Sequence, residues 1–291
     1  MIQYATSFFK NQISQVRIGG RRVFVAKVIR AILLIPVTVF AVLFLLIISV
    51  LQPFYLVRLG GLISNRLGHF AGNTELYLCE RDAGINVPNK PYVDIFYMGP
   101  ICNQQLAKMW KRELVIAPVY LGYILMHVNR LIGIFSRIIP GLNAYLKAHL
   151  IGDNNSDRDV FNLLDKTEKH IEFTDEEEAY GQELLKKYKI PTDAKIVLLT
   201  VRDDAYLDKI QPHNDWSYHN YRNCDINNFI KASEELANRG FYVIRMGLHV
   251  KKGLHSNNPF VIDYATNGMR DDFMDIYLAS ICTFIITTGT G

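Results

Sequence analysis

The chain has 291 residues, of which 49% are hydrophobic and 21% are charged. This composition excludes a disordered or low-complexity protein, because enough apolar surface is present to bury one or two cores. The net charge of +4 is uneven, since eight Lys and Arg residues precede the first acidic residue, Glu75, and the rest of the chain is slightly acidic. The soluble part is therefore not a basic nucleic-acid binder, and we expect no nucleic-acid partner.

An uncharged segment of 27 residues separates Arg30 from Arg58. Its core, 31–51, has 21 residues, which is long enough for a helix to cross about 30 Å of hydrocarbon. We therefore expect residues 1–53 to form a basic N-terminus and a hydrophobic membrane helix, and we name the membrane as a partner. A buried core helix is the alternative interpretation. A signal peptide is disfavoured, because no small-residue cleavage site follows.

The charges around this segment bear on its topology. Six cations precede it, and the positive-inside rule keeps such residues in the cytoplasm. A single span would then put residues 58–291 outside, away from cytoplasmic metabolites. A re-entrant or shallow helix, bent at Pro36 and Pro53, keeps both ends on the cytoplasmic face, and this is our hypothesis.

A second apolar stretch covers 119–150 and is interrupted by Arg130, Arg137 and Lys147. The two arginines are seven residues apart and share one helical face. The stretch is typical of an interfacial membrane helix or of a core helix of the first domain, and the sequence leaves both open.

Beyond residue 53, short apolar segments alternate with helical patterns, which predicts an α/β fold with parallel sheets. The expected strands cover 54–59, 93–98, 114–117, 195–201, 241–245, 260–262 and 283–287, with Gly60-Gly61 ending the first. The expected helices cover 67–82, 103–112, 225–238 and 271–279, together with one that begins at a Thr174–Glu177 capping box and ends near Tyr188. We predict two Rossmann-like domains in tandem, at 54–190 and 191–291, a layout that resembles that of two-domain nucleotide-sugar transferases, in which an acceptor domain precedes a nucleotide-sugar domain.

The cysteines and histidines do not predict a metal centre. The four cysteines lie far apart without CxxC spacing, and the eight histidines show no HxxxH or HxH spacing near carboxylates. We interpret the cysteines as reduced thiols of a cytoplasmic domain. We expect no metal ligands and no cofactor.

Polar residues at strand ends carry the predicted donor site, because ligands of parallel sheets bind outside the carboxyl ends of the strands. Two guanidiniums and a small-residue loop of backbone N–H groups suit a diphosphate. An ordinary surface or ion-paired arginine is the alternative at each position. The candidate donor-binding residues are Arg202, Asp203, Arg245, Thr288, Gly289 and Thr290.

Two further stretches supply candidates for the reaction. In the first, His69 or Glu75 would take a proton from an acceptor hydroxyl, and Asn73 shares a helical face with His69. A structural histidine and a solvated glutamate are the alternatives. The second is the polar, aromatic-rich loop 213–223, typical of binding loops. The candidate substrate-binding residues are Arg66, Asn73, Tyr221 and Arg222.

The stretches GHFAGNTELYLCERD, ICNQQLAKMWKRELVIAP, VRDDAYL, YRNCDINNFIKA, FYVIRMG and the final TTGTG, as a set, resemble a family of bacterial surface-polysaccharide glycosyltransferases. The resemblance covers about 54–291 and extends to GT-B, fucosyltransferase-like enzymes, in which Arg202 looks like the diphosphate-binding arginine. It departs from the family at Thr200, where a histidine is usual. The family pattern also continues beyond the final glycine loop, so the resemblance implies an incomplete C-terminal domain.

The resemblance implies a function. The protein would transfer a sugar from a nucleotide-sugar donor to a glycan or lipid-linked acceptor, without a metal, at the cytoplasmic face of a bacterial inner membrane. Basic residues and helix N-termini would neutralise the leaving diphosphate. The competing hypothesis is a catalytically inactive, membrane-attached module that binds nucleotide sugars or partner enzymes.

Overall fold

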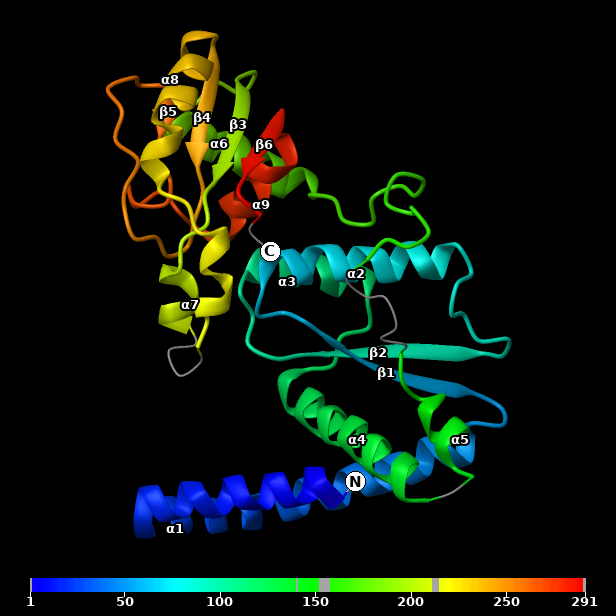
Figure 1. Cartoon of the computed structure of the whole chain (residues 1–291). Coiled ribbons are helices and arrows are strands. Elements are labelled where there is room, and N and C mark those ends of the chain that lie inside the picture. The colour runs from blue at the N-terminus through cyan, green and yellow to red at the C-terminus, as the bar shows by residue number, and fades with distance from the viewer. Residues whose placement is uncertain (1, 140, 152–157, 211–214, 290–291) are drawn as a thin grey trace. The chain divides into compact units, whose positions relative to one another are not determined.

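The computed structural model describes residues 2–139, 141–151, 158–210 and 215–289. The protein is a mixed α/β chain with parallel sheets and one long apolar N-terminal helix, as the sequence predicts (Figure 1). The chain divides into two compact units. Unit 1 comprises 1–62, 84–98 and 114–154, and unit 2 comprises 63–83, 99–113 and 155–291. The predicted domains 54–190 and 191–291 are consecutive ranges, and they stay a prediction.

The N-terminal helix α1 covers Ile2–Leu51. Its helical backbone is interrupted at Gly20, where φ is 61°, a left-handed value that glycine adopts without a steric penalty. Pro36 lies inside the helix, and Pro53 follows its end. Among the described residues, two helices are long and apolar enough to cross a membrane, Gly19–Leu51 of α1 and α4 (Val119–Ile138).

The core of unit 1 joins α1, α4 and a two-stranded parallel sheet. The sheet pairs β1 (Leu56–Leu62) with β2 (Tyr92–Met98), and the short helix α5 (Asn143–Lys147) lies beside α4. One face of α4 is buried in this core, whereas Tyr120 and Arg130 of α4 are exposed. One face of α4 therefore belongs to the core of unit 1, and another face of the same helix is exposed. The buried residues that α1 and α4 contribute to this core are Ala41, Leu45, Ile48, Leu125, Val128 and Ile132.

Opposite charges fix the register of the unit 1 sheet. Arg58 and Asp94 face each other in the β1–β2 register and are both buried. The Arg58 Nε donates to Asp94 Oδ1 at 2.6 Å, and its Nη1 donates to the Asn86 carbonyl at 2.6 Å. A slip by one residue would bury both charges without partners, which is costly.

Two strand predictions in this unit are wrong in detail. Gly60 and Gly61 do not end the first strand but lie inside β1. A methyl group added at Gly60 would lie 2.8 Å from the Phe96 ring, and one at Gly61 would lie 3.0 Å from the Tyr97 ring, so the glycines make room for aromatic side chains of β2. Residues 114–117 form only an isolated bridge between Phe96 and Ile116, not a strand.

Unit 2 contains a four-stranded parallel sheet in the order β5-β4-β3-β6. The strands are β3 (Lys195–Thr200), β4 (Phe241–Arg245), β5 (Val261–Ile262) and β6 (Phe284–Thr287). The α-helices are α2 (Leu67–Asp82), α3 (Gln104–Glu113), α6 (Asp175–Lys187), α7 (Ala205–Ile210), α8 (Ile230–Asn238) and α9 (Asp272–Ile281). Two 3-10 helices, η1 (Ser217–Arg222) and η2 (Ile226–Phe229), complete the unit. The predicted helix 225–238 is thus split between η2 and α8, and α7 was not predicted.

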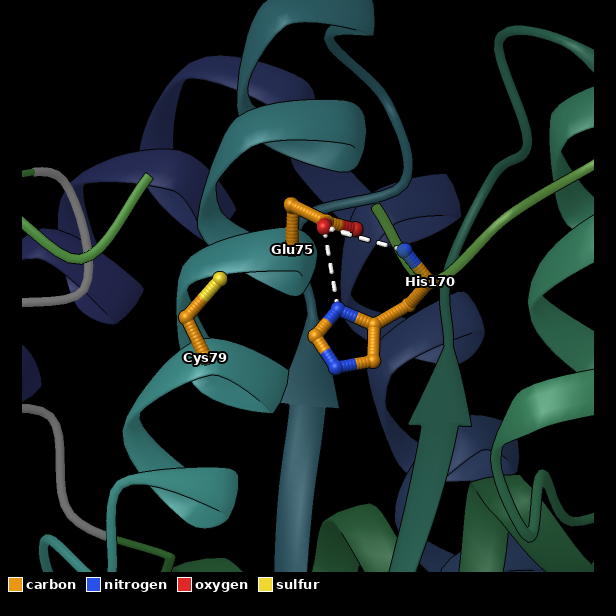
Figure 2. A group of neighbouring side chains, drawn as sticks. All are labelled: Glu75, Cys79 and His170. Carbon is orange, nitrogen blue, oxygen red and sulfur yellow. Dashed lines mark hydrogen bonds and ion pairs between the residues drawn. The ribbon is translucent and has the colours of Figure 1, made fainter. Parts of the chain in front are cut away.

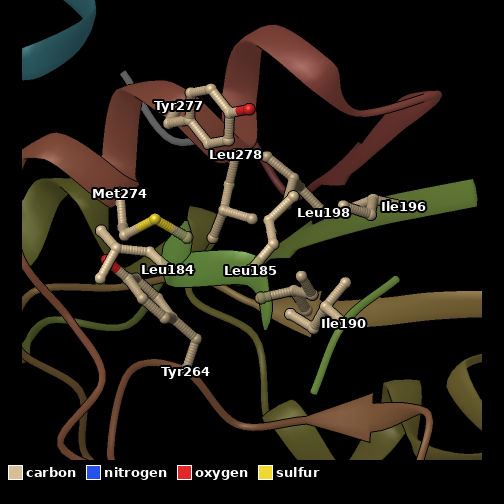
Figure 3. Packing of buried hydrophobic residues seen from close by; sticks show 10 residues of the cluster. Leu184, Leu185, Ile190, Ile196, Leu198, Tyr264, Met274, Tyr277 and Leu278 are labelled. Atoms are coloured by element: carbon tan, nitrogen blue, oxygen red, sulfur yellow. The ribbon is translucent and has the colours of Figure 1, made fainter. Parts of the chain in front are cut away.

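Strand β3 lies at the centre of this sheet and is buried on both faces. Ile196 and Leu198 belong to one hydrophobic cluster, which α6 and α9 complete with Leu185 and Leu278 (Figure 3). Val197 and Leu199 point the other way and belong to a second cluster with Val243 and Ile226. Such burial explains why the strand reads as a continuous apolar run rather than as an alternating one.

Helix α6 starts as the sequence predicts, with a capping box. Thr174 accepts from the Glu177 N–H at 3.2 Å, and Glu177 accepts from the Thr174 N–H at 3.1 Å. The Glu177 carboxylate, which is 7% exposed, also accepts from Gln105, Lys108 and Arg112 of α3 at 2.8–3.1 Å. Burial raises the pKa of Glu177, but these bonds outweigh burial and bring the pKa down to about 2. The carboxylate therefore ties α3 to α6.

We predict that Glu177→Gln destabilises the chain above pH 5. The carboxylate has a lower pKa in the folded state, so its stabilising effect is full above the unfolded pKa of about 4.5 and is lost as pH falls toward about 2. The shift corresponds to about 3 kcal/mol at neutral pH. Thermal denaturation from pH 7 to pH 2 should show a gap between wild type and variant that closes at low pH. Glu183→Gln, exposed on the same helix, should show no such gap.

We also predict that Gly181→Ala destabilises the chain by about 1–3 kcal/mol. Alanine normally favours a helix over glycine, but a methyl group at Gly181 of α6 would lie 2.3 Å from the Tyr277 ring of α9. The matched control is Gly72→Ala in α2, where nothing lies within 4 Å and the melting temperature should hold or rise. A Gly181→Ala variant as stable as the control would contradict the tight packing of α6 on α9.

Candidate functional site

The carboxyl ends of β3 and β6 bring two predicted donor-binding residues together. These strands pair in parallel, so the residues that follow them emerge at one edge of the sheet. The Arg202 backbone N–H donates to Thr288 Oγ1 at 2.9 Å, and the Thr288 N–H donates to the Thr200 carbonyl at 3.2 Å. The Thr200 carbonyl therefore holds the loop after β6.

The segment 215–223 adds a second guanidinium to this edge. Arg222, in η1, donates from Nη2 to the carbonyl of Gly289, whose φ is 71°. Arg202 donates from Nε to Asn223 Oδ1 at 3.3 Å. The predicted residues Arg222 and Gly289 are thus in contact, and Asn223 orients Arg202.

Arg66 and His219 lie close to these arginines. Arg66, the residue before α2, lies over the Trp216 ring at 5.8 Å. His219 has an Nδ1 atom that is buried and without a hydrogen-bond partner among the described residues. Burial lowers the pKa of His219, and the charges of Arg202, Arg222 and Arg66 lower it further. We call Arg66, Arg202, Arg222 and His219 the arginine cluster.

The charge of the arginine cluster is not balanced by ion pairs. Within the described ranges, no carboxylate pairs with Arg66, Arg202 or Arg222. Burial lowers the pKa of Arg202, and the neighbouring charge of Arg222 lowers it further. Like charges held this close favour binding of an anion, and planar guanidiniums match phosphate oxygens best.

Asp203 and Asp204 follow Arg202 but are engaged elsewhere. Asp203 accepts from the N–H groups of Ala205 at 3.0 Å and Lys251 at 2.8 Å. Asp204 pairs with the Lys251 ammonium. Asp203, a predicted donor-binding residue, therefore fastens the start of α7 and the loop after β4.

A pocket of about 300 Å³ opens beside the end of β3. Its walls combine the residues after β3, the start of η2 and the loop after β4, and they carry charges of both signs. The lining residues are Val201, Asp203, Asp204, Asn223, Cys224, Asp225, Ile226, Arg245, Lys251 and Lys252. Asn223 thus reaches both the pocket and the arginine cluster.

Arg245 differs from the other predicted arginines because its charge is already neutralised. It is 1% exposed and its Nη1 lies 3.2 Å from Asp263 Oδ1, although its Nε has no hydrogen-bond partner among the described residues. Asp263 also accepts from the Leu254 N–H at 2.9 Å. The pair ties β4 to the loop after β5, and a diphosphate-binding role for Arg245 stays a prediction.

The two candidate bases lie on α2, in the same unit as the arginine cluster. His69 is half-buried, lies one turn after Arg66, and has its Nδ1 3.4 Å from Asn73 Oδ1. Glu75 instead accepts from the His170 N–H at 3.2 Å and lies 2.9 Å from His170 Nδ1 (Figure 2). Burial lowers the pKa of His170, but its hydrogen bonds to Asp82 and Glu75 outweigh burial and raise the pKa. Glu75 is therefore paired, whereas His69 Nε2 makes no hydrogen bond within the described part of the chain.

The remaining candidates differ in their surroundings. Tyr221 is 83% exposed and Asn73 is half-buried. Thr290 lies outside the described residues. Sequence reasoning missed His219, Asn223 and His170. The first two lie in the loop that was singled out, three residues or fewer from Arg222, but His170 is far from Glu75 in sequence and no spacing pattern marks it.

Comparisons with known protein families, with curated proteins and with solved structures find no match to this chain. The geometry of the site is therefore the basis for any statement about its chemistry.

Proposed function

We propose that this chain is a membrane-associated glycosyltransferase of GT-B type that binds the diphosphate of a nucleotide sugar at the arginine cluster. One observation carries the proposal: three guanidiniums, none of them ion-paired with a carboxylate in the described part of the chain, lie around His219 at the carboxyl ends of β3 and β6. Sugar transfer releases a nucleoside diphosphate, and cations that stabilise the leaving diphosphate lower the barrier.

The strand order of unit 2 supports this position for the ligand. Numbered within the unit, β5-β4-β3-β6 reads 3-2-1-4, which matches the first four strands of the Rossmann order 3-2-1-4-5-6. The chain leaves β3 toward β4 on one side and later returns to pair β6 on the other. Ligands of such sheets bind where the order reverses, and Arg202 and Thr288 follow the two strands at that point.

In the proposed reaction, His69 Nε2 takes the proton of an acceptor hydroxyl as that oxygen forms a bond to the anomeric carbon of the sugar. The bond between this carbon and the diphosphate oxygen breaks, and the oxygen keeps the electron pair. Arg202 and Arg222 stabilise the charge that develops on the diphosphate. Asn73 orients the His69 ring through Nδ1. We prefer His69 to Glu75 as the base because His170 already occupies the Glu75 carboxylate.

The apolar surface of α1 supports attachment to a membrane. Between Phe24 and Val50, large apolar side chains of α1 are exposed, whereas the positions that face α4 are buried. Because α4 packs along the C-terminal half of α1, a fully spanning α1 would carry α4 to membrane depth as well. A shallow insertion of both helices, with the remaining residues on the cytoplasmic face of a bacterial inner membrane, fits this packing better.

We predict that Arg202→Ala weakens binding of UDP and GDP about ten- to a hundredfold and leaves binding of uridine and guanosine unchanged. A charge-assisted bond to phosphate contributes about 1.5–3 kcal/mol. Arg202→Lys should recover only part of the affinity, because lysine lacks the planar fork. Isothermal titration of the full chain in detergent measures both effects.

The matched control is Arg239→Ala, because Arg239, the residue that follows α8, is exposed and pairs with Glu235. It should change neither affinity. Equal losses for diphosphate and nucleoside in Arg202→Ala would assign Arg202 a structural role. Diphosphate binding without sugar transfer from any nucleotide sugar would instead favour the inactive binding module.

We further predict that Leu33→Asp together with Phe40→Asp moves the chain from the membrane pellet to the supernatant. Both side chains are more than 60% exposed, so the fold loses little, whereas each aspartate disfavours insertion by about 3 kcal/mol. Sedimentation of cell extracts measures the shift. Gln182→Asp with Lys186→Asp, exposed on α6, is the control and should stay in the pellet. Retention of the α1 variant would mean that α1 is not the anchor.

A further inference from the structure

Helix α2 presents three potential metal ligands on one face. Glu75, Cys79 and Asp82 follow each other at spacings of four and three residues, so they lie on successive turns. His170, from the segment between α5 and α6, faces them (Figure 2). Among the described residues, ligand atoms of Glu75, Cys79 and His170 all lie within 4.8 Å of one another. Carboxylate, thiolate and imidazole from two separate chain segments thus converge.

The two nitrogens of His170 have different neighbours. Nε2 lies 2.9 Å from Asp82 Oδ2, and Nδ1 lies 2.9 Å from Glu75 Oε1. A histidine that binds a metal through one nitrogen commonly donates its other N–H to a carboxylate, which fixes the ring. Asp82 is placed to do this, and it leaves Nδ1 as the ligand nitrogen.

Two further atoms are consistent with a ligand between these side chains. Glu75 Oε2 is buried and has no hydrogen-bond partner among the described residues. Cys79 is 1% exposed, and the Thr167 side chain hydrogen-bonds its sulfur. Thr167 and His170 belong to the same segment, so this segment contacts both Cys79 and Glu75.

We propose that Glu75, Cys79 and His170 form a zinc site, with Asp82 as the residue that positions His170. Zinc bonds of 2.0–2.3 Å give ligand-to-ligand distances of about 3.3–3.6 Å in a tetrahedron. The Glu75–His170 pair, at 2.9 Å, is already near this value, and the thiol has to approach by at most about 1 Å. The fourth position is filled by water.

Zinc binding displaces two protons, one from His170 Nδ1 and one from the Cys79 thiol, and both pass to solvent. The neutral imidazole, the thiolate and the carboxylate then leave the zinc ion and its three protein ligands without net charge. In this role zinc fastens residues 158–173 to α2 and is not part of the sugar-transfer proposal. The competing arrangement is an imidazolium held by Glu75 and Asp82 without a metal, and the experiment separates the two.

The test uses the full chain in detergent, stripped with a chelator and titrated with Zn²⁺ and, separately, Co²⁺. We expect one zinc per chain by elemental analysis, a higher melting temperature with zinc, and a thiolate-to-cobalt charge-transfer band. Cys79→Ser should abolish the band and weaken zinc binding by at least about tenfold, and Cys102→Ser, the matched control outside the cluster, should leave both unchanged.

Asp82→Asn tests the positioning role. It should weaken zinc binding about 10- to 100-fold while retaining the cobalt–thiolate band, because the ligands themselves are intact. Wild-type protein that binds no zinc, or that binds it equally well after Cys79→Ser, would overturn the proposal. If Cys79→Ser fails to fold, a wild-type cobalt complex without the charge-transfer band gives the same negative answer.

Discussion

Burial of β3 on both faces is the constraint on which unit 2 depends. A strand covered by α6 and α9 on one face and by η2 and its neighbours on the other has no room for polar side chains along its length. Polar groups can emerge only where the strand ends, and there Arg202 meets the residue after β6 and the loop that carries Arg222. The same packing that excludes water from the sheet thus concentrates positive charge at its carboxyl edge, where it is available to an anion.

The sequence predicts most elements of this fold because their signals are local. Helix α2 was predicted to the residue, β4 likewise, and the capping box that starts α6 is present with both of its hydrogen bonds. The predictions fail at positions whose structure depends on residues that are distant in the sequence. Gly60 and Gly61 read as a break, but their lack of side chains admits the aromatic rings of β2, which no local pattern reveals. Residues 114–117 have the composition of a strand but only bridge the edge of β2 at one point.

In the candidate site too, the residues set by local sequence and strand topology are predicted, and those set by distant residues are not. Strand-end reasoning predicted Arg202 and Thr288, because parallel topology alone brings them to one edge. It also selected Arg245, but it could not foresee Asp263, eighteen residues later, as a buried partner. The positions of His219 and Asn223 depend on the conformation of η1, which the sequence does not reveal. The position of His170 depends on the path of the long segment before α6. Glu75 was chosen as a free base, whereas the structure gives it a histidine partner from that segment.

The contact between His170 and α2 has a consequence for the order in which unit 2 can open. His170 lies four residues before Thr174, so the segment that it anchors leads directly into the cap of α6. Local opening proceeds first through regions with few buried contacts, and residues 158–169 contain no helix or strand. His170 therefore separates residues 158–169, which contain no helix or strand and contact α2 through Thr167, from a part of the chain whose detachment would unwind α6. We expect a protease to cut before His170 while the rest of unit 2 stays folded. Cleavage after His170 would require the cooperative unfolding of unit 2.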